Sequence, residues 1–189
     1  MIATPGQTVG PFFGYALPFP GGELLVPTSH PRAVRLHGTV RDGNGDGIPD
    51  ALVELWQADE AGRVVQAPGS LQRDGYTFTG FGRTPVDATG DYSFTTLVPG
   101  AEDGRAPFFA ITVFARGLLN RLFTRAYLPG DADLLAADPL LASLPAERRD
   151  TLVATPEPDG FRFDIVLQGD GETVFLHYPG ERPRRSPGH

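Results

Sequence analysis

The chain has 189 residues, a net charge of -7 from 16 basic and 23 acidic side chains, and a hydrophobic content of 40%. That length suits one domain, predicted to span residues 1–189, and leaves too little chain for a second independent core. Lysine and cysteine are absent, which excludes lysine Schiff bases, thiolate nucleophiles, disulfides and zinc–thiolate sites. The chain carries no basic stripe, long apolar run or signal-like start, so we expect a cytoplasmic protein with no nucleic-acid or membrane partner.

The first stretch of the chain combines proline and glycine with aromatic residues. Residues 4–15 read TPGQTVGPFFGY, and proline and glycine at this density disfavour both a helix and a central strand. Because Phe12, Phe13 and Tyr15 are costly to leave in water, we predict that residues 1–32 form an extended arm. This arm is expected to dock, either on its own domain or on a partner.

From residue 33 onward, alternating apolar and polar residues predict half-buried strands, and the aromatic and β-branched run at 108–114, which Pro107 can start, predicts a central strand. Strands are expected at 33–40, 51–57, 92–97, 108–114, 122–128, 161–167 and 173–177, with Trp56 as the large apolar anchor of the second. Residues 59–83 read as a long loop with strand fragments. The 24 glycines and 19 prolines supply the turns. We therefore predict an all-β fold, a β-sandwich of about eight short strands.

One short helix and a mobile tail complete the expected architecture. The helix is predicted within 138–153, with Pro145 at its start and Arg148 and Arg149 near its end. Residues 182–189 are polar and rich in proline, so we expect a mobile tail there.

The segment 41–50, RDGNGDGIPD, is similar to the beginning of a calcium-binding loop. The matching residues are Asp42, Asn44, Asp46 and Gly47. The twelfth position of the loop is Val53, however, where a bidentate glutamate is required. Since Asp-Gly and Asn-Gly pairs are also strong hairpin signals, the sequence favours a turn over a metal site.

No complete catalytic constellation is visible in the residue types. The four histidines form neither a His-x-His pair nor a pair four residues apart; they are His30, His37, His177 and His189. Surface or strand positions explain them more simply than metal ligation does. A Gly-x-Ser-x-Gly elbow and a His-Glu-x-x-His motif are also absent. The residues alone therefore support a β-sandwich with an aromatic arm and no assigned chemistry.

A series of segments, taken together, resembles the protocatechuate 3,4-dioxygenase family of intradiol dioxygenases. In chain order they are TPGQTVGPFF at 4–13, GTVRDG at 38–43, VELWQAD at 53–59, FGRT at 81–84, GDYSF at 90–94, TVFARG at 112–117 and FRFDIVLQGDGETVF at 161–175. That family is built from two homologous sandwich chains, α and β. The resemblance implies an intradiol dioxygenase-like sandwich.

The resemblance also indicates which of the two chains is present. Catalytic chains of the family bind a non-haem ferric ion through two tyrosines and two histidines, the histidines standing as His-x-His. Aligned on TVF at 112–114, this chain has Phe108 and Ala110 at the histidine positions, and neither side chain can donate to a metal. After Gly100 it has Ala101 where the catalytic chain has a tyrosine. The resemblance therefore implies an α chain with no catalytic or metal-binding residue, whose partner β subunit binds the Fe(III).

The activity that the resemblance implies is cleavage of 3,4-dihydroxybenzoate by O2 between its two hydroxyls, giving 3-carboxy-cis,cis-muconate in the β-ketoadipate pathway. The implied role of this chain is to shape the substrate pocket and the hetero-oligomer. The family's α-chain arm lines the pocket with a Thr-x-Gly-Pro segment, matched here by Thr8, Gly10 and Pro11. Arg125 matches an α-chain arginine at the same mouth, where a guanidinium attracts a carboxylate.

Two alternatives from other classes remain open. A non-enzymatic, transthyretin-like binding module would explain the strands and the Asp-Gly turn without using the arm. A self-sufficient catechol or hydroxyquinol dioxygenase would need iron ligands that Phe108 and Ala110 cannot supply. Arg105 matches an arginine of the family's histidine strand, and the sequence leaves open whether it has any function.

Overall fold

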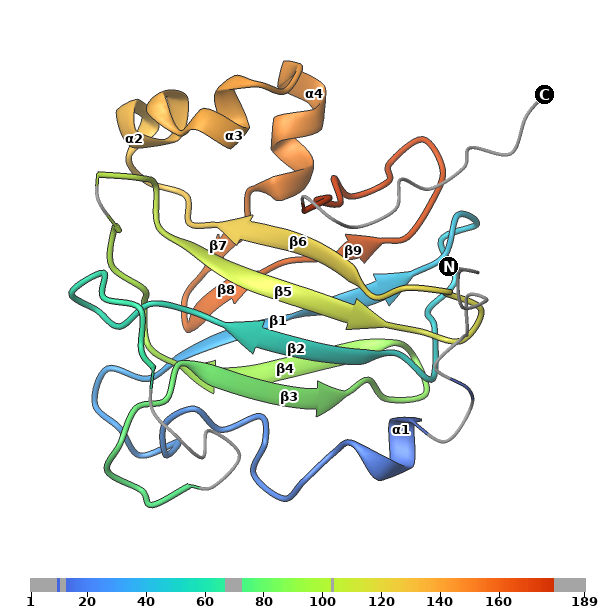
Figure 1. Cartoon of the computed structure of the whole chain (residues 1–189), viewed down its shortest axis with the longest axis horizontal. Helices are drawn as coiled ribbons and strands as arrows, with labels where there is room; N and C mark the ends of the chain where they lie inside the picture. Colours follow the sequence, from blue (N-terminus) through green and yellow to red (C-terminus); the bar gives the residue numbers. More distant parts are fainter. Residues whose placement is uncertain (1–9, 11–12, 67–72, 103, 179–189) are drawn as a thin grey trace, which may run out of the picture.

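The computed structural model describes residues 10, 13–66, 73–102 and 104–178. Its strands form two sheets that lie face to face, as the predicted sandwich requires (Figure 1). The first sheet has the order β4-β1-β8-β7 with β9 also paired to β1, and the second has the order β3-β2-β5-β6. The strands are β1 Val34–Arg41, β2 Leu52–Trp56, β3 Phe81–Pro85, β4 Asp91–Thr96, β5 Phe108–Phe114, β6 Leu122–Tyr127, β7 Thr155–Glu157, β8 Gly160–Arg162 and β9 Ile165–Val166.

The main core lies between the two sheets because alternate residues of each strand point inward. Leu36 and Phe94 come from the first sheet, and Leu55, Phe109 and Ile111 come from the second. Each of these five side chains is at most 1% exposed. The predicted alternation is thus confirmed for the central strands.

Trp56 is an exception to the predicted packing, because the sequence suggested a buried anchor and the structure leaves 43% of this residue exposed. Val53 and Leu55 face the core, so Glu54 and Trp56 occupy the outer face of β2. The indole packs there against Phe81, with ring centroids 4.5 Å apart.

The strand predicted at 161–167 is divided into β8 and β9. β8 and β9 each pair with β1 in parallel. Between them, the side chain of Asp164 replaces a backbone acceptor, because its Oδ1 accepts a hydrogen bond from the N–H of Thr39 at 2.9 Å. β7 was missed because Pro156 and Pro158 argue against a strand, yet an edge strand tolerates proline. The strand predicted at 173–177 is wrong, since only a single bridge joins Leu176 to Phe123 there.

The helical region is more divided than the predicted single helix. It consists of α2 Ala132–Ala137, α3 Pro139–Ala142, α4 Ala146–Arg149 and the 3-10 turn η1 Asp150–Leu152. Asp138 ends α2 and caps α3, while Pro145 precedes α4 as predicted. These helices cover a second, smaller core that contains Tyr127, Leu141 and Leu152 (Figure 1).

The described part of the arm docks on its own sandwich. It begins with a short helix, α1 Phe13–Ala16, in which Phe13 is buried. Leu25 and Val26 join the buried residues, and Leu25 N–H donates to the carbonyl of Thr95 at 2.8 Å. The rest of the arm, including the positions of Thr8 and Pro11, and the predicted tail at 182–189 lie outside the described residues. In the described part of the chain, no helix has the length and apolar character needed to cross a membrane.

The segment that resembles a calcium loop is a turn, as the sequence favoured. The carboxylate of Asp42 accepts the backbone N–H groups of Asn44 and Asp46 at 2.9 and 3.0 Å. The N–H of Asp42 in turn donates to the carbonyl of Asp46. Asp42 therefore uses its side chain to close the turn.

Candidate functional site

The candidate site lies on the outer face of the second sheet. Cross-strand pairing sets Trp56 of β2 opposite Ala110 of β5, and Ala110 opposite Arg125 of β6. Phe108 precedes Ala110 by two residues and therefore shares its face. Phe108 and Ala110, which the resemblance aligns with the family's two histidines, thus stand beside an exposed indole and a guanidinium.

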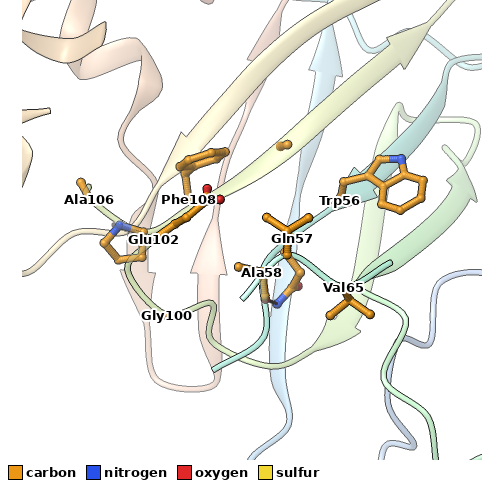
Figure 2. A pocket seen from close by; sticks show the side chains of 11 residues that line it. Trp56, Gln57, Ala58, Val65, Gly100, Glu102, Ala106 and Phe108 are labelled. Carbon is orange, nitrogen blue, oxygen red and sulfur yellow. Dashed lines mark hydrogen bonds between the residues drawn. The ribbon is translucent and has the colours of Figure 1, made fainter. Parts of the chain in front are cut away.

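A hollow of about 190 Å³ opens at this place. Trp56 and Phe108 stand at opposite sides of it, with Gln57 between them (Figure 2). Ala110 lines it from β5, and Val64 and Val65 contribute from the long loop that follows β2. The lining is predominantly apolar, so the hollow suits a small apolar or aromatic group.

The lining does not fit a ferric ion. Phe108 and Ala110 have no donor atoms. Gln57 is engaged at both ends, because its amide N–H donates to the carbonyl of Leu97 at 2.9 Å and its amide oxygen accepts from Thr96. Glu102 supplies only one carboxylate. Across the described ranges, no group of three or more His, Cys, Asp or Glu residues could hold a metal ion.

Arg125 is half-buried and is fixed by two neighbours. Its guanidinium carbon lies 4.0 Å from the centroid of the Phe108 ring, a cation–π contact. Its Nη1 donates to the hydroxyl of Tyr127 at 3.0 Å. Among the described residues, no carboxylate forms an ion pair with Arg125. Its positive charge can therefore serve an external anion.

The hydroxyl of Tyr127 connects Arg125 to Asp138 by hydrogen bonds. It donates to Oδ1 of Asp138 at 3.0 Å, and both residues are at most 1% exposed. Burial raises the pKa of Tyr127 to about 12, against the opposing effect of the nearby Arg125 charge. The phenol therefore keeps its proton over the pH range in which enzymes are assayed.

The other predicted site residues are not gathered around Arg125 by the described structure. Gly10 is half-buried with φ = 74°, a left-handed conformation that favours glycine. It precedes α1, which Figure 1 shows at the opposite end of the sandwich from the start of β5. Arg105 is exposed, so its guanidinium needs no buried acceptor.

Sequence reasoning missed Trp56 as a site residue, and it missed Tyr127 and Asp138 altogether. The face of Trp56 could have been read from Val53 and Leu55, whose alternation turns it outward. The pair Asp138-Pro139 was a usable helix-start signal. Nothing in the sequence links Asp138 to Tyr127, because the contact depends on how α3 packs against β6.

The comparisons with known proteins agree with this fold. The family model described as Dioxygenase matches residues 9–169. The chain belongs to this family, the intradiol dioxygenases, which use non-haem iron.

Among its relatives, the chain is 43% identical to the protocatechuate 3,4-dioxygenase alpha chain of Burkholderia cepacia, covering 92% of this chain and 96% of that one. It is 36% identical to the protocatechuate 3,4-dioxygenase beta chain of the same organism, covering 82% of this chain and 68% of that one. A solved dioxygenase domain from Streptomyces sp. SirexAA-E superimposes with a TM-score of 0.58 at 26% identity, covering 88% and 98% of the two chains.

Proposed function

We propose that this chain is the α subunit of a protocatechuate 3,4-dioxygenase, the non-iron-binding partner in intradiol cleavage of 3,4-dihydroxybenzoate. One observation carries the proposal: Phe108 and Ala110, which the resemblance aligns with the family's ligand histidines, line the hollow and have no donor atom. The greater identity to an alpha chain than to a beta chain supports the same assignment. The self-sufficient dioxygenase is disfavoured for the same reason.

The partner β subunit supplies the Fe(III) and its ligands in this proposal, and no chemical step is carried by residues of this chain. Its contribution is to bind and orient. Thr8, Gly10 and Pro11 of the arm line the substrate pocket between subunits, where a hydroxyl and a closely approaching backbone suit an aromatic acid. Arg125 attracts the substrate carboxylate.

The test of the assignment is the partition of iron and activity between two preparations. We expect the chain alone to contain no stoichiometric iron and to consume no O2 with 3,4-dihydroxybenzoate. Co-expression with a β chain is expected to give an iron-containing complex that consumes O2. Iron and activity in the isolated chain would contradict the proposal, and a folded chain that stays inactive with every β chain tried would favour the binding module.

Replacing Arg125 by alanine in the assembled enzyme is expected to raise KM for 3,4-dihydroxybenzoate by about tenfold or more, because a charge-assisted hydrogen bond to the substrate is lost. kcat is expected to change much less, since the guanidinium does not touch the reacting atoms. The measurement is steady-state O2 uptake over a range of substrate concentrations.

Arg125→Lys is the matched control, because it keeps the charge and loses the planar two-point geometry. It is expected to recover part of the affinity. If KM stays unchanged in Arg125→Ala, the substrate-binding role of this residue is removed while the α-subunit assignment is left standing.

A further inference from the structure

Three side chains form a continuous hydrogen-bonded chain from the outer face of the second sheet into the smaller core. Arg125 donates to the Tyr127 hydroxyl, which donates to Oδ1 of Asp138, each at 3.0 Å. Arg125 and Tyr127 are two residues apart on β6, so they lie on one face of the strand. Asp138 is the junction between α2 and α3.

Asp138, at the inner end of this series of hydrogen bonds, is held by backbone groups. Oδ1 of Asp138 also accepts the N–H groups of Leu140 and Leu141 at 2.9 and 3.3 Å, and the N–H of Asp138 donates to the carbonyl of Leu134. The Tyr127 ring is enclosed by the same core and lies 5.4 Å from the Phe108 ring. The side chains of Asp138 and Tyr127 are therefore held in one position.

The Arg125 guanidinium, at the outer end of the series, would be mobile without Tyr127 and Asp138. An arginine side chain has many rotamers, and binding an anion with it loses less conformational entropy when the guanidinium is already held. The cation–π contact with Phe108 restrains the guanidinium against the ring, while the bond to Tyr127 fixes one nitrogen. The remaining N–H groups then have a defined direction.

The surroundings of Asp138 indicate that the hydrogen bonds joining Arg125, Tyr127 and Asp138 do more than stabilise the fold. Oδ2 of Asp138 is buried and has no hydrogen-bond partner in the described structure. A buried carboxyl group with one unsatisfied oxygen is costly compared with an apolar side chain at the same position. A role outside the core gives a reason for retaining it.

We propose that Tyr127 and Asp138 are positioning residues that orient the Arg125 guanidinium for the carboxylate of the aromatic substrate. The inference rests on the proposed function, in which Arg125 receives that carboxylate. Neither Tyr127 nor Asp138 contacts the substrate; both act through Arg125.

The test compares two phenols that differ only in a carboxylate, 4-hydroxybenzoate and phenol, as ligands of the assembled αβ complex. The dissociation constant of each is measured by calorimetry or by competition with substrate. Tyr127→Phe is expected to raise Kd for 4-hydroxybenzoate by about threefold to tenfold and to leave Kd for phenol unchanged. In the double variant with Arg125→Ala, we expect no loss beyond that of Arg125→Ala alone, because both substitutions act through one contact.

Tyr92→Phe is the matched control. Tyr92 is also a buried tyrosine whose hydroxyl makes a hydrogen bond, in this case to the carbonyl of Phe163 at 2.6 Å. It lies in the first sheet, away from Arg125. If the weaker binding came only from the loss of a buried hydroxyl, both variants would show it. A rise in Kd that is confined to Tyr127→Phe and to 4-hydroxybenzoate supports the positioning role.

Three outcomes would overturn the inference. If Arg125→Ala weakens 4-hydroxybenzoate binding but Tyr127→Phe does not, Arg125 binds the carboxylate without help. If Tyr127→Phe weakens both ligands equally, its effect is structural. If Arg125→Ala leaves both dissociation constants unchanged, the proposed role of Arg125 fails and the inference fails with it. Asp138→Asn gives a second measurement: its amide oxygen can still accept from Tyr127 and from the two N–H groups of α3 but carries no negative charge, so it is expected to weaken 4-hydroxybenzoate binding less than Tyr127→Phe does and to leave phenol binding unchanged.

Discussion

Replacing Gly38 by alanine is expected to lower the free energy of unfolding by about 3 kcal/mol, the upper end for an overpacked interior. Gly38 lies in β1, and a Cβ atom built there would stand 2.0 Å from the carbonyl oxygen of Phe163. That oxygen accepts the Tyr92 hydroxyl, and the N–H of Phe163 donates to the carbonyl of His37 at 2.7 Å. The added methyl group must therefore displace backbone that is hydrogen-bonded on both sides.

The measurement for Gly38→Ala is urea unfolding followed by the fluorescence of Trp56, the single tryptophan of the chain. Gly14→Ala is the control, because a Cβ atom at Gly14 would meet nothing within 4 Å and α1 tolerates alanine. We expect its free energy of unfolding to stay within about 1 kcal/mol of the parent value. Equal unfolding midpoints for the two variants would contradict the close approach of Phe163 to β1.

The parts of the fold that sequence could predict are those decided within a few residues. The strand at 108–114 agrees with β5 at both ends, because an aromatic and β-branched run and the flanking Pro107 are local signals. The turn at Asp42 follows from its own side chain. In each case, the residues that specify the structure are neighbours in the chain.

The parts that sequence could not predict depend on contacts between distant segments. Gly38 fits an alternating strand, and nothing local shows that the chain near Phe163 passes against it. The division of 161–167 depends on Asp164 reaching Thr39, a residue 125 positions away. The Tyr127–Asp138 contact likewise depends on the packing of α3. Local patterns predicted the strands, and tertiary packing decided their interruptions and the surroundings of Arg125.

Replacing Arg83 by alanine is expected to lower the free energy of unfolding by about 2–4 kcal/mol, because it leaves Glu54 as an unpaired, largely buried carboxylate. Nε and Nη2 of Arg83 lie 2.8 and 2.6 Å from the same oxygen of Glu54, and the two side chains are 16% and 14% exposed. Nη1 donates to the carbonyl of Leu17 at 3.0 Å. The ion pair thus connects the outer face of β2 and β3 to the arm.

Arg83→Ala also removes a hydrogen bond that holds the arm on the sandwich, and amide hydrogen exchange can measure the effect. Since Leu17 follows α1 directly, losing the Arg83 contact should increase amide hydrogen exchange at Phe13–Ala16 and Leu17 more than at β5. Arg63→Ala is the matched control, because its ion pair with Asp59 is 80% exposed on the arginine side and solvent screening leaves such a pair with little effect on stability. Unfolding midpoints that fall equally in both variants would show that burial of the Glu54 pair contributes nothing. Faster exchange at α1 in Arg83→Ala, together with a raised KM in the assembled enzyme, would link the anchoring of this arm to the pocket role proposed for Thr8, Gly10 and Pro11, because ordering an unanchored arm on binding lowers affinity.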